Sequence, residues 1–216
     1  NGYARSAEIT LGTYTVVETK FPQNYRKYDK DNWTVTLNSG SAKFTINAVN
    51  EIVPGACRII KASEDGVIAG VSFRITGNGT DETAKTNENG EIIFSSLKPG
   101  RYTVTEDTED KYIPQESKSV TVVTGETAVV TFSNVLKKGS LKVVKTAEDG
   151  FKENFTFRLT GTSYSGLPVN EYAVTNNDGE AFFENVLIGT DYVLEEINTP
   201  ARYVVPESQT ALIEWN

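Results

Sequence analysis

The chain of 216 residues carries 29 acidic and 21 basic side chains, for a net charge of −8, and its ten tyrosines and ten phenylalanines suffice for several cores. Acidic charge spread without long runs argues against nucleic acid or an anionic membrane as partner, and no apolar run approaches the roughly 18–20 residues of a membrane span. The lack of histidine excludes His-based triads and most zinc sites, so we expect no metal and no cofactor. The single Cys57 excludes an internal disulfide framework.

Comparison of the sequence with itself predicts three tandem modules. Residues 50–77 match residues 134–161 without a gap, which indicates a duplicated domain. We predict that residues 1–54 are the C-terminal part of a module that begins at its central hairpin turn, that residues 55–138 form a complete module, and that residues 139–216 form a third. The short linkers favour a semi-rigid string of domains, and any export signal or anchor is expected outside this chain.

The middle module consists of short runs that are rich in β-branched and aromatic residues and largely alternate in polarity, separated by turns such as Asn-Gly and Pro-Gly. The predicted strands are residues 59–61, 71–75, 91–94, 101–106, 119–123 and 128–134. No segment longer than about ten residues has a helical period. The predicted fold class is therefore all-β, as tandem β-sandwich domains with about seven strands per module.

The stretch from Gly100 to Glu106, GRYTVTE, has counterparts at residues 12–18 and 189–196. A tyrosine precedes an acid by four residues in each copy, so in a strand the two side chains share one face. We expect Tyr102, Val104 and Glu106 to point into the core, and the same for Glu18 and Glu196. A carboxylate in a sandwich core is costly unless it is neutralised, paired or used.

Two further polar residues fall on inward positions of the middle module, Lys61 on its first strand and Asn134 on its last. The third module offers Lys145 and Asn216. Its last residues Ala211, Ile213 and Trp215 also look inward, however, which would place the equivalent of Asn134 just past residue 216. The first module keeps Asn50, in phase with Phe44, Ile46 and Ala48, and its partner lysine is missing from the chain.

Three interpretations of these polar residues remain open. In the first, the inward and outward faces of these strands are assigned the wrong way round and the residues lie on the surface. In the second, they form a buried Lys–Glu ion pair capped by an amide. In the third, they are the reactants of a chemical step. Burial lowers the pKa of a lysine and raises that of a glutamate, so a neutral amine can lie beside a carboxamide. A protonated glutamate would then polarise the Asn carbonyl and shuttle protons as ammonia leaves, giving a Lys–Asn isopeptide bond.

The residues from Lys61 to Glu106 also carry a family resemblance. The segments Glu64-Asp65-Gly66, Gly70-Val71-Ser72-Phe73, Thr86-Asn87-Glu88-Asn89-Gly90 and Leu97-Lys98-Pro99-Gly100-Arg101-Tyr102 resemble the Cna B-type, or prealbumin-like (SpaA-type), domain of Gram-positive surface adhesins and pilins. The same pattern covers the third module and, from mid-domain, residues 1–54.

The resemblance implies a reversed immunoglobulin-like sandwich with self-formed Lys–Asn bonds promoted by glutamate. Carried over by position, the bonds are Lys61–Asn134 with Glu106 and Lys145–Asn216 with Glu196. Glu18 and Asn50 are the equivalents in the truncated module. It also implies an extracellular location at the cell surface or wall of a Gram-positive bacterium, with no catalysis beyond this single turnover. The chain shows no sortase sorting motif and no clear Tyr-Pro-Lys motif, so pilus backbone, minor pilin and adhesin stay open.

The first functional hypothesis is therefore a structural stalk or pilin segment, with other pilin subunits as partners, that holds a binding domain away from the cell. The alternative is a module that grips a host-matrix protein or glycan through exposed aromatics, and an enzyme acting on an external substrate is disfavoured. The candidate aromatics are Tyr25, Tyr28, Trp33, Tyr164 and Tyr172. Residues 64–66 and 176–180 have calcium-type ligands without the full loop spacing and are interpreted as turns, and Cys57 as a small core residue.

Overall fold

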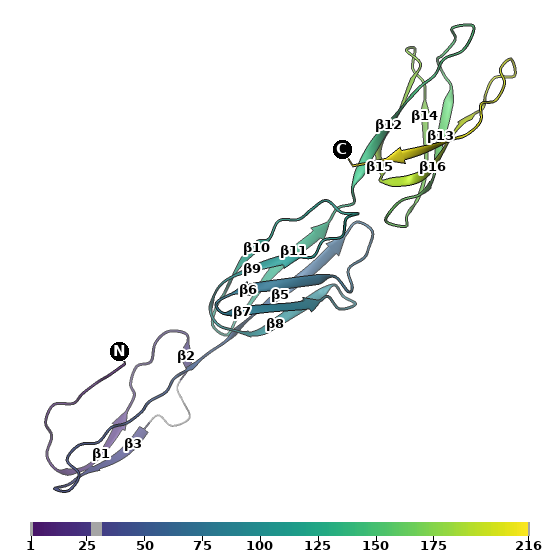
Figure 1. The fold of residues 1–216 in the computed structure, drawn as a ribbon. Coiled ribbons are helices and arrows are strands. Elements are labelled where there is room, and N and C mark those ends of the chain that lie inside the picture. Colours follow the sequence, from purple (N-terminus) through teal and green to yellow (C-terminus); the bar gives the residue numbers. More distant parts are fainter. Residues whose placement is uncertain (1, 27–31, 216) are drawn as a thin grey trace.

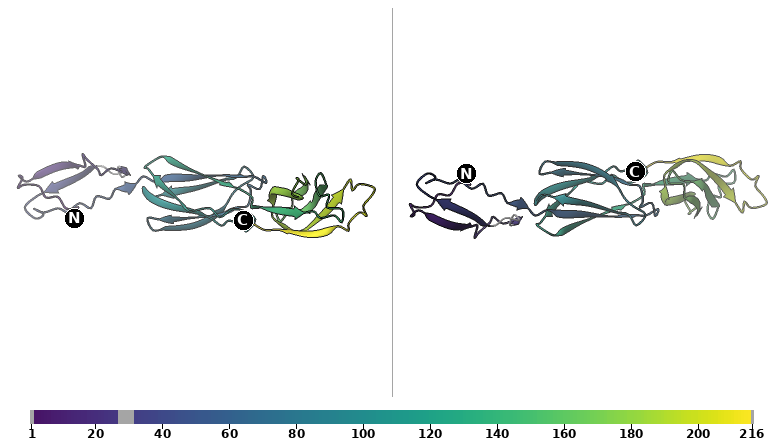
Figure 2. Two further views of the ribbon diagram at one scale, coloured as in Figure 1. Left: turned by 90° about the horizontal axis from the view of Figure 1, so that it is seen from above. Right: turned by 90° about the horizontal axis from the view of Figure 1, so that it is seen from below.

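The computed structural model describes residues 2–26 and 32–215, and within these ranges it contains strands and no helix. The prediction of an all-β protein is confirmed. Accordingly, the described part of the chain has no helix long and apolar enough to cross a membrane. The strands form three groups that lie end to end in an extended row (Figures 1 and 2), which we call the N-terminal, middle and C-terminal units.

The middle unit is a sandwich of seven strands in two sheets, seen as separate layers in Figure 2. One sheet has the order β10-β9-β6-β7, with β10 at Lys118–Val122, β9 at Gly100–Glu106, β6 at Ser72–Gly77 and β7 at Thr80–Lys85. The other has the order β11-β5-β8, with β11 at Thr127–Asn134, β5 at Gly55–Ser63 and β8 at Glu91–Leu97. The first and last strands, β5 and β11, are parallel neighbours, whereas the other pairs are antiparallel.

Strand β7 is absent from the sequence-based prediction because its residues, TDETAK, do not alternate between polar and apolar. It is an edge strand with mostly exposed side chains, paired only with β6. Two-residue alternation of polar and apolar residues marks strands with one buried face, and β7 has almost no buried face. The core between the sheets contains Cys57, Ile59, Phe73, Ile75, Ile92, Phe94, Leu97, Tyr102, Val104, Val120, Val122 and Phe132.

The C-terminal unit repeats this plan with one strand fewer among the described residues. Its larger sheet has the order β14-β13-β16-β17, with strands at Pro168–Val174, Thr156–Thr162, Gly189–Ile197 and Gln209–Ile213. Its smaller sheet pairs β12, Lys138–Val144, with β15, Glu180–Leu187. No equivalent of β11 lies beside β12 within the described residues, and β12 ends at Val144 just before Lys145.

Strand β17 corresponds to β10, not to β11. Ala211 pairs with Tyr192 as Val120 pairs with Tyr102. A second observation agrees, because Gly139 lies against Ile213 and Glu214 as Gly55 lies against Val122 and Val123. The inward residues Ala211 and Ile213 are therefore not part of a last strand that could carry an equivalent of Asn134.

The N-terminal unit has two small sheets, β1 (Gly12–Val17) with β3 (Asn32–Leu37), and β2 (Tyr25–Arg26) with β4 (Glu51–Ile52). The prediction that Phe44, Ile46 and Ala48 alternate along a last strand with Asn50 is wrong, because residues 42–50 form no strand. The equivalent strand of the middle unit, β11, pairs with β5, and the described residues of the N-terminal unit contain no counterpart of β5. Without that partner Phe44 is 58% exposed.

The glycine that ends each of the segments FRITG and FRLTG packs against a strand that carries a buried tyrosine. The rings of Tyr102 and Tyr192 are buried, and their hydroxyl groups donate to the main-chain oxygens of Lys98 at 2.8 Å and Leu187 at 2.7 Å. A Cβ atom on Gly77, whose φ is +139°, would lie 2.7 Å from the Arg101 carbonyl oxygen. Only glycine leaves room there for the neighbouring strand.

We expect Gly77→Ala to destabilise the middle unit by about 3 kcal/mol, because it adds a steric clash to an unfavourable φ. Gly79→Ala is the matched control, since Gly79 also has a positive φ, +84°, but no atom within 4 Å of its added Cβ. It should cost only about 1 kcal/mol. Calorimetric unfolding of the two variants measures the difference, and equal costs would show that the contact with Arg101 is unimportant.

Candidate functional site

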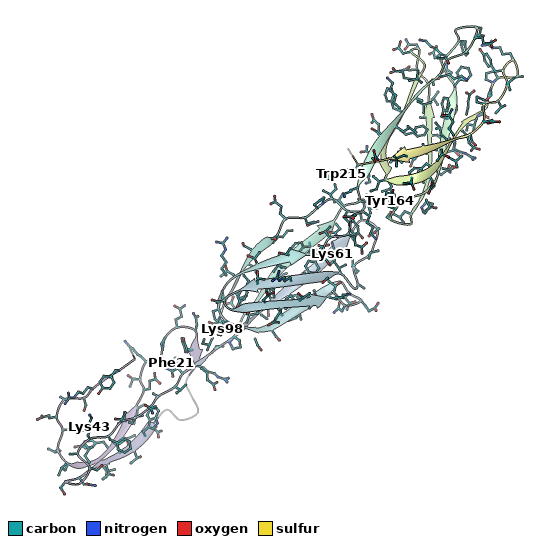
Figure 3. All side chains as sticks on the ribbon, viewed as in Figure 1. Phe21, Lys43, Lys61, Lys98, Tyr164 and Trp215 are labelled. Carbon is teal, nitrogen blue, oxygen red and sulfur yellow. The ribbon has the colours of Figure 1, made fainter. Side chains whose placement is uncertain are left out.

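Lys61, Glu106 and Asn134 meet inside the middle unit. Lys61 and Asn134 come from the adjacent strands β5 and β11, and Glu106 reaches them from β9 in the opposite sheet. The Lys61 Nζ lies 3.3 Å from Glu106 Oε1, and the Asn134 Nδ2 donates to the same oxygen at 2.5 Å. The Lys61 and Glu106 side chains have no exposed surface, and Asn134 is 1% exposed. Figure 3 shows Lys61 within the middle unit.

The surroundings of Lys61 are unfavourable for its charged form. Although Lys61 Nζ is near Glu106 Oε1, it makes no hydrogen bond with acceptable angles within the described structure, and neither does Glu106 Oε2. Burial lowers the pKa of Lys61, and the attraction of Glu106 only partly opposes this. A buried amine with a lowered pKa has a larger neutral, nucleophilic fraction than a surface lysine.

The orientation of the Asn134 amide differs from the expected one. The sequence-based hypothesis has Glu106 polarise the Asn134 carbonyl, but Glu106 contacts the amide nitrogen instead. The carbonyl oxygen accepts a hydrogen bond of 3.2 Å from Gln115 Nε2, in the loop between β9 and β10. Gln115 was missed because a half-buried polar residue in a loop leaves no periodic signal. A cavity of about 270 Å³ is lined by both Glu106 and Asn134.

The C-terminal unit contains the corresponding amine and acid. Lys145 Nζ donates to Glu196 Oε2 at 2.7 Å, and the hydroxyl of Thr199 donates to Glu196 Oε1 at 3.0 Å. The Glu196 side chain is 1% exposed and that of Lys145 13%. The predicted partner Asn216 lies outside the described residues.

The N-terminal unit contains the corresponding acid and amide. Asn50 Nδ2 donates to Glu18 Oε1 at 2.9 Å, the same contact that Asn134 makes with Glu106. Both residues are half-buried. The sequence of this unit therefore keeps the local geometry of the site even without a last strand.

A second polar contact supports the site and was not predicted from the sequence. The Tyr112 hydroxyl lies 2.8 and 2.9 Å from the two carboxylate oxygens of Asp65, and Tyr203 makes the same pair of contacts with Asp149. A sequence signal for this contact does exist, because a tyrosine follows both Glu106 and Glu196 by a few residues, at positions 112 and 203. The contact ties the loop after β9 to the loop after β5, next to Lys61.

The other candidates take structural roles. The pKa of the fully buried Cys57 thiol is raised by burial, which makes the thiol less reactive. Asn176 Oδ1 accepts hydrogen bonds from the amides of Asp178 and Glu180, as expected for a turn. Among the proposed ligand-binding aromatics, Tyr164 and Tyr172 are exposed in the C-terminal unit, Tyr25 and Trp33 are half-buried in the N-terminal unit, and Tyr28 lies outside the described residues.

Comparisons with known proteins give a consistent family. The family model described as SpaA, prealbumin-like fold domain, matches residues 1–52, 55–136 and 139–214. The Bacillus anthracis TIE protein matches with 26% identity and a TM-score of 0.62, covering 94% of this chain and 39% of that one, so the chain spans less than half of that protein. No curated protein sequence matches.

Pilins are also among the structural matches. A streptococcal ancillary pilin matches at 19% identity and a TM-score of 0.35, covering 94% of this chain and 72% of that chain. The shaft pilin spaA of Lactobacillus rhamnosus GG matches at 15% identity and a TM-score of 0.33, covering 74% of this chain and 93% of that chain.

We expect the middle unit to lose stability in acid through Asp65. Burial alone would raise the pKa of Asp65, but hydrogen bonds from Ser63, Tyr112, the Val67 amide and Lys111 outweigh it and hold the pKa at about 2, against 3.8 ordinarily. Since the folded-state pKa is the lower one, this stabilisation is complete above about pH 5 and disappears as the pH falls toward 2. It amounts to about 2 kcal/mol.

Unfolding measured from pH 5 to pH 2 tests this. Asp65→Asn should flatten the pH dependence, whereas Asp81→Asn, which changes an exposed carboxylate paired with Arg74, should leave it nearly unchanged. An equally steep pH dependence in Asp65→Asn would contradict the assignment.

Proposed function

The chain belongs to the SpaA family of prealbumin-like fold domains, and from this membership and the buried triad we propose that it is a stalk or pilin segment whose middle unit is cross-linked by an isopeptide bond between Lys61 and Asn134. The observation that carries the proposal is that the amine and the amide nitrogen both contact one oxygen, Glu106 Oε1, in a site without solvent exposure. The three residues come from different strands, β5, β9 and β11, so their positions in the sequence do not by themselves bring them together.

The reaction needs no reagent outside the triad. Transfer of one proton from Lys61 to Glu106 gives a neutral amine and a neutral acid. The amine adds to Cγ of Asn134, Glu106 gives its proton to Nδ2, and ammonia leaves as the Cγ–Nδ2 bond breaks. Glu106 then takes one proton from Nζ, so an amine and a carboxamide become a secondary amide and ammonia. Proximity within the folded core supplies much of the acceleration.

The arrangement of the units supports a stalk. They lie end to end (Figure 1), and hydrogen bonds are present at both junctions. Thr124 donates to Asn24 at 2.5 Å between the first two units, and Glu64 accepts from Lys138 and from the Leu136 amide where the chain passes into the third. A row of sandwiches with hydrogen-bonded junctions keeps a terminal domain at a distance.

The proposed cellular location and partners of the segment rest on the family to which the chain belongs. We place the segment outside the cell, at the surface or wall of a Gram-positive bacterium, where a cross-link that resists reduction replaces the disulfides that one cysteine cannot form. Other pilin-like subunits are the proposed partners. Binding of a host-matrix protein or glycan would belong to another domain, because among the described candidate aromatics only Tyr164 and Tyr172 are exposed.

The mass of the denatured 216-residue chain tests the proposal. We expect it to be lower than the sequence mass by one ammonia, not two, because among the described residues only the middle unit has amine, acid and amide together. The bond would stabilise the unit by about 4 kcal/mol through closure of a long loop. A chain of full sequence mass would refute the proposal, and loss of two ammonia molecules would restore Asn216 as a partner.

We further expect Glu106→Ala to leave the middle unit folded with Lys61 and Asn134 unlinked. Glu196→Ala is the matched control, since it removes the equivalent acid of the C-terminal unit and should leave the loss of one ammonia unchanged. Mass spectrometry of both variants, with circular dichroism to verify folding, measures the outcome. If Glu106→Ala still releases ammonia, Glu106 is not the catalyst.

A further inference from the structure

Gln115 is placed to act on the carbonyl oxygen of Asn134. Its Nε2 donates to Asn134 Oδ1 at 3.2 Å and also to the main-chain carbonyl oxygen of Ser133. A main-chain carbonyl oxygen accepts hydrogen bonds and does not donate them, so the contact with Ser133 fixes which end of the Gln115 amide is the NH₂ group. That group in turn fixes the Asn134 amide, with its oxygen toward Gln115 and its nitrogen toward Glu106.

We propose that Gln115 is a catalytic residue of the isopeptide reaction, the hydrogen-bond donor that stabilises negative charge on Asn134 Oδ1. This inference rests on the proposed Lys61–Asn134 bond. When Lys61 Nζ adds to Cγ, the C=O double bond becomes a C–O single bond and its electron pair moves to Oδ1. A donor already directed at this oxygen stabilises the transition state more than the ground state, since the charge is larger there.

The two contacts of the Asn134 amide give Glu106 and Gln115 different roles in the reaction. Glu106 Oε1 touches the two nitrogen atoms, the one that enters and the one that leaves, and so handles protons. Gln115 touches the oxygen, which needs a donor and no proton transfer. The electron pair returns from Oδ1 to re-form the C=O bond when ammonia departs, so Gln115 is unchanged at the end of the reaction.

The other units provide an internal comparison. Gln115 lies three residues after Tyr112, and the residue three positions after Tyr203 in the C-terminal unit is Pro206, which has no donor group. In the N-terminal unit Asn50 Oδ1 is buried and has no hydrogen-bond partner in the described structure. Among the described residues, the donor to the carbonyl oxygen therefore occurs in the unit in which all three reactants are assembled.

The rate of bond formation in the whole chain tests the assignment. Chains made by a short pulse of cell-free synthesis are quenched in acid at increasing times, and the fraction that has lost ammonia is read by mass spectrometry. Gln115→Met keeps the length of the side chain without a donor, and Gln115→Glu keeps its shape but presents an acceptor. We expect Met to slow the reaction about tenfold or more, and Glu to slow it further.

Ser117→Ala is the matched control in the same loop. Ser117 shares a hydrogen bond of 2.8 Å with Thr105, on the exposed side of the loop, so its loss should leave the rate within about twofold of the wild type. Circular dichroism of each purified variant shows whether it folds, and Gln115→Glu, the closest in shape, serves if Gln115→Met does not.

The outcomes separate the two proposals. A wild-type chain that never loses ammonia overturns the isopeptide bond and, with it, the role of Gln115. A wild-type chain that loses ammonia, with folded Gln115 variants that react at the same rate, overturns only the role of Gln115. Equal slowing by Ser117→Ala would also overturn it, because the loop rather than the donor would then control the rate.

Discussion

The burial of a lysine and a glutamate between two sheets is the constraint on which the middle unit depends. Removing both charged groups from water costs several kcal/mol each, and the single contact between Lys61 and Glu106 leaves an amine and a carboxylate oxygen without hydrogen bonds. The site also fixes strand register, because a shift of β9 by one residue would turn Glu106 outward. Stability and register are thus coupled to the same three side chains.

The three units show how much of the site depends on each strand. The acid is present in all of them and contacts whichever partner its unit supplies, the amide in the N-terminal unit and the amine in the C-terminal unit. Within the described residues, only the middle unit combines a first, a penultimate-region and a last strand, β5, β9 and β11, and only there does one carboxylate oxygen contact both groups. The GRYTVTE strand therefore positions the acid, and the β5–β11 pair brings in the reactants.

The sequence predicted the all-β class, the repeats and the inward face of β9, because two-residue alternation and duplication are properties of local sequence. It did not predict β7, which is an edge strand without alternation, or the lack of a strand near Asn50, which depends on a partner far away in sequence. Gln115 and the Tyr112–Asp65 contact were also missed, since side chains from loops meet only after the sheets have packed.

The parallel pairing of β5 with β11 has a mechanical consequence. The chain enters the middle unit at Gly55 and leaves it beyond Asn134, at opposite ends of two adjacent parallel strands. A tensile load along the row would ordinarily shear these strands apart and extend everything between them. If the proposed bond joins Lys61 to Asn134, the load would pass along β5, through the amide and out of the unit, so residues 62–133 would carry none of it. The middle unit would then transmit tension with almost no extension of its own, whereas the two units without the bond and the junctions could still extend.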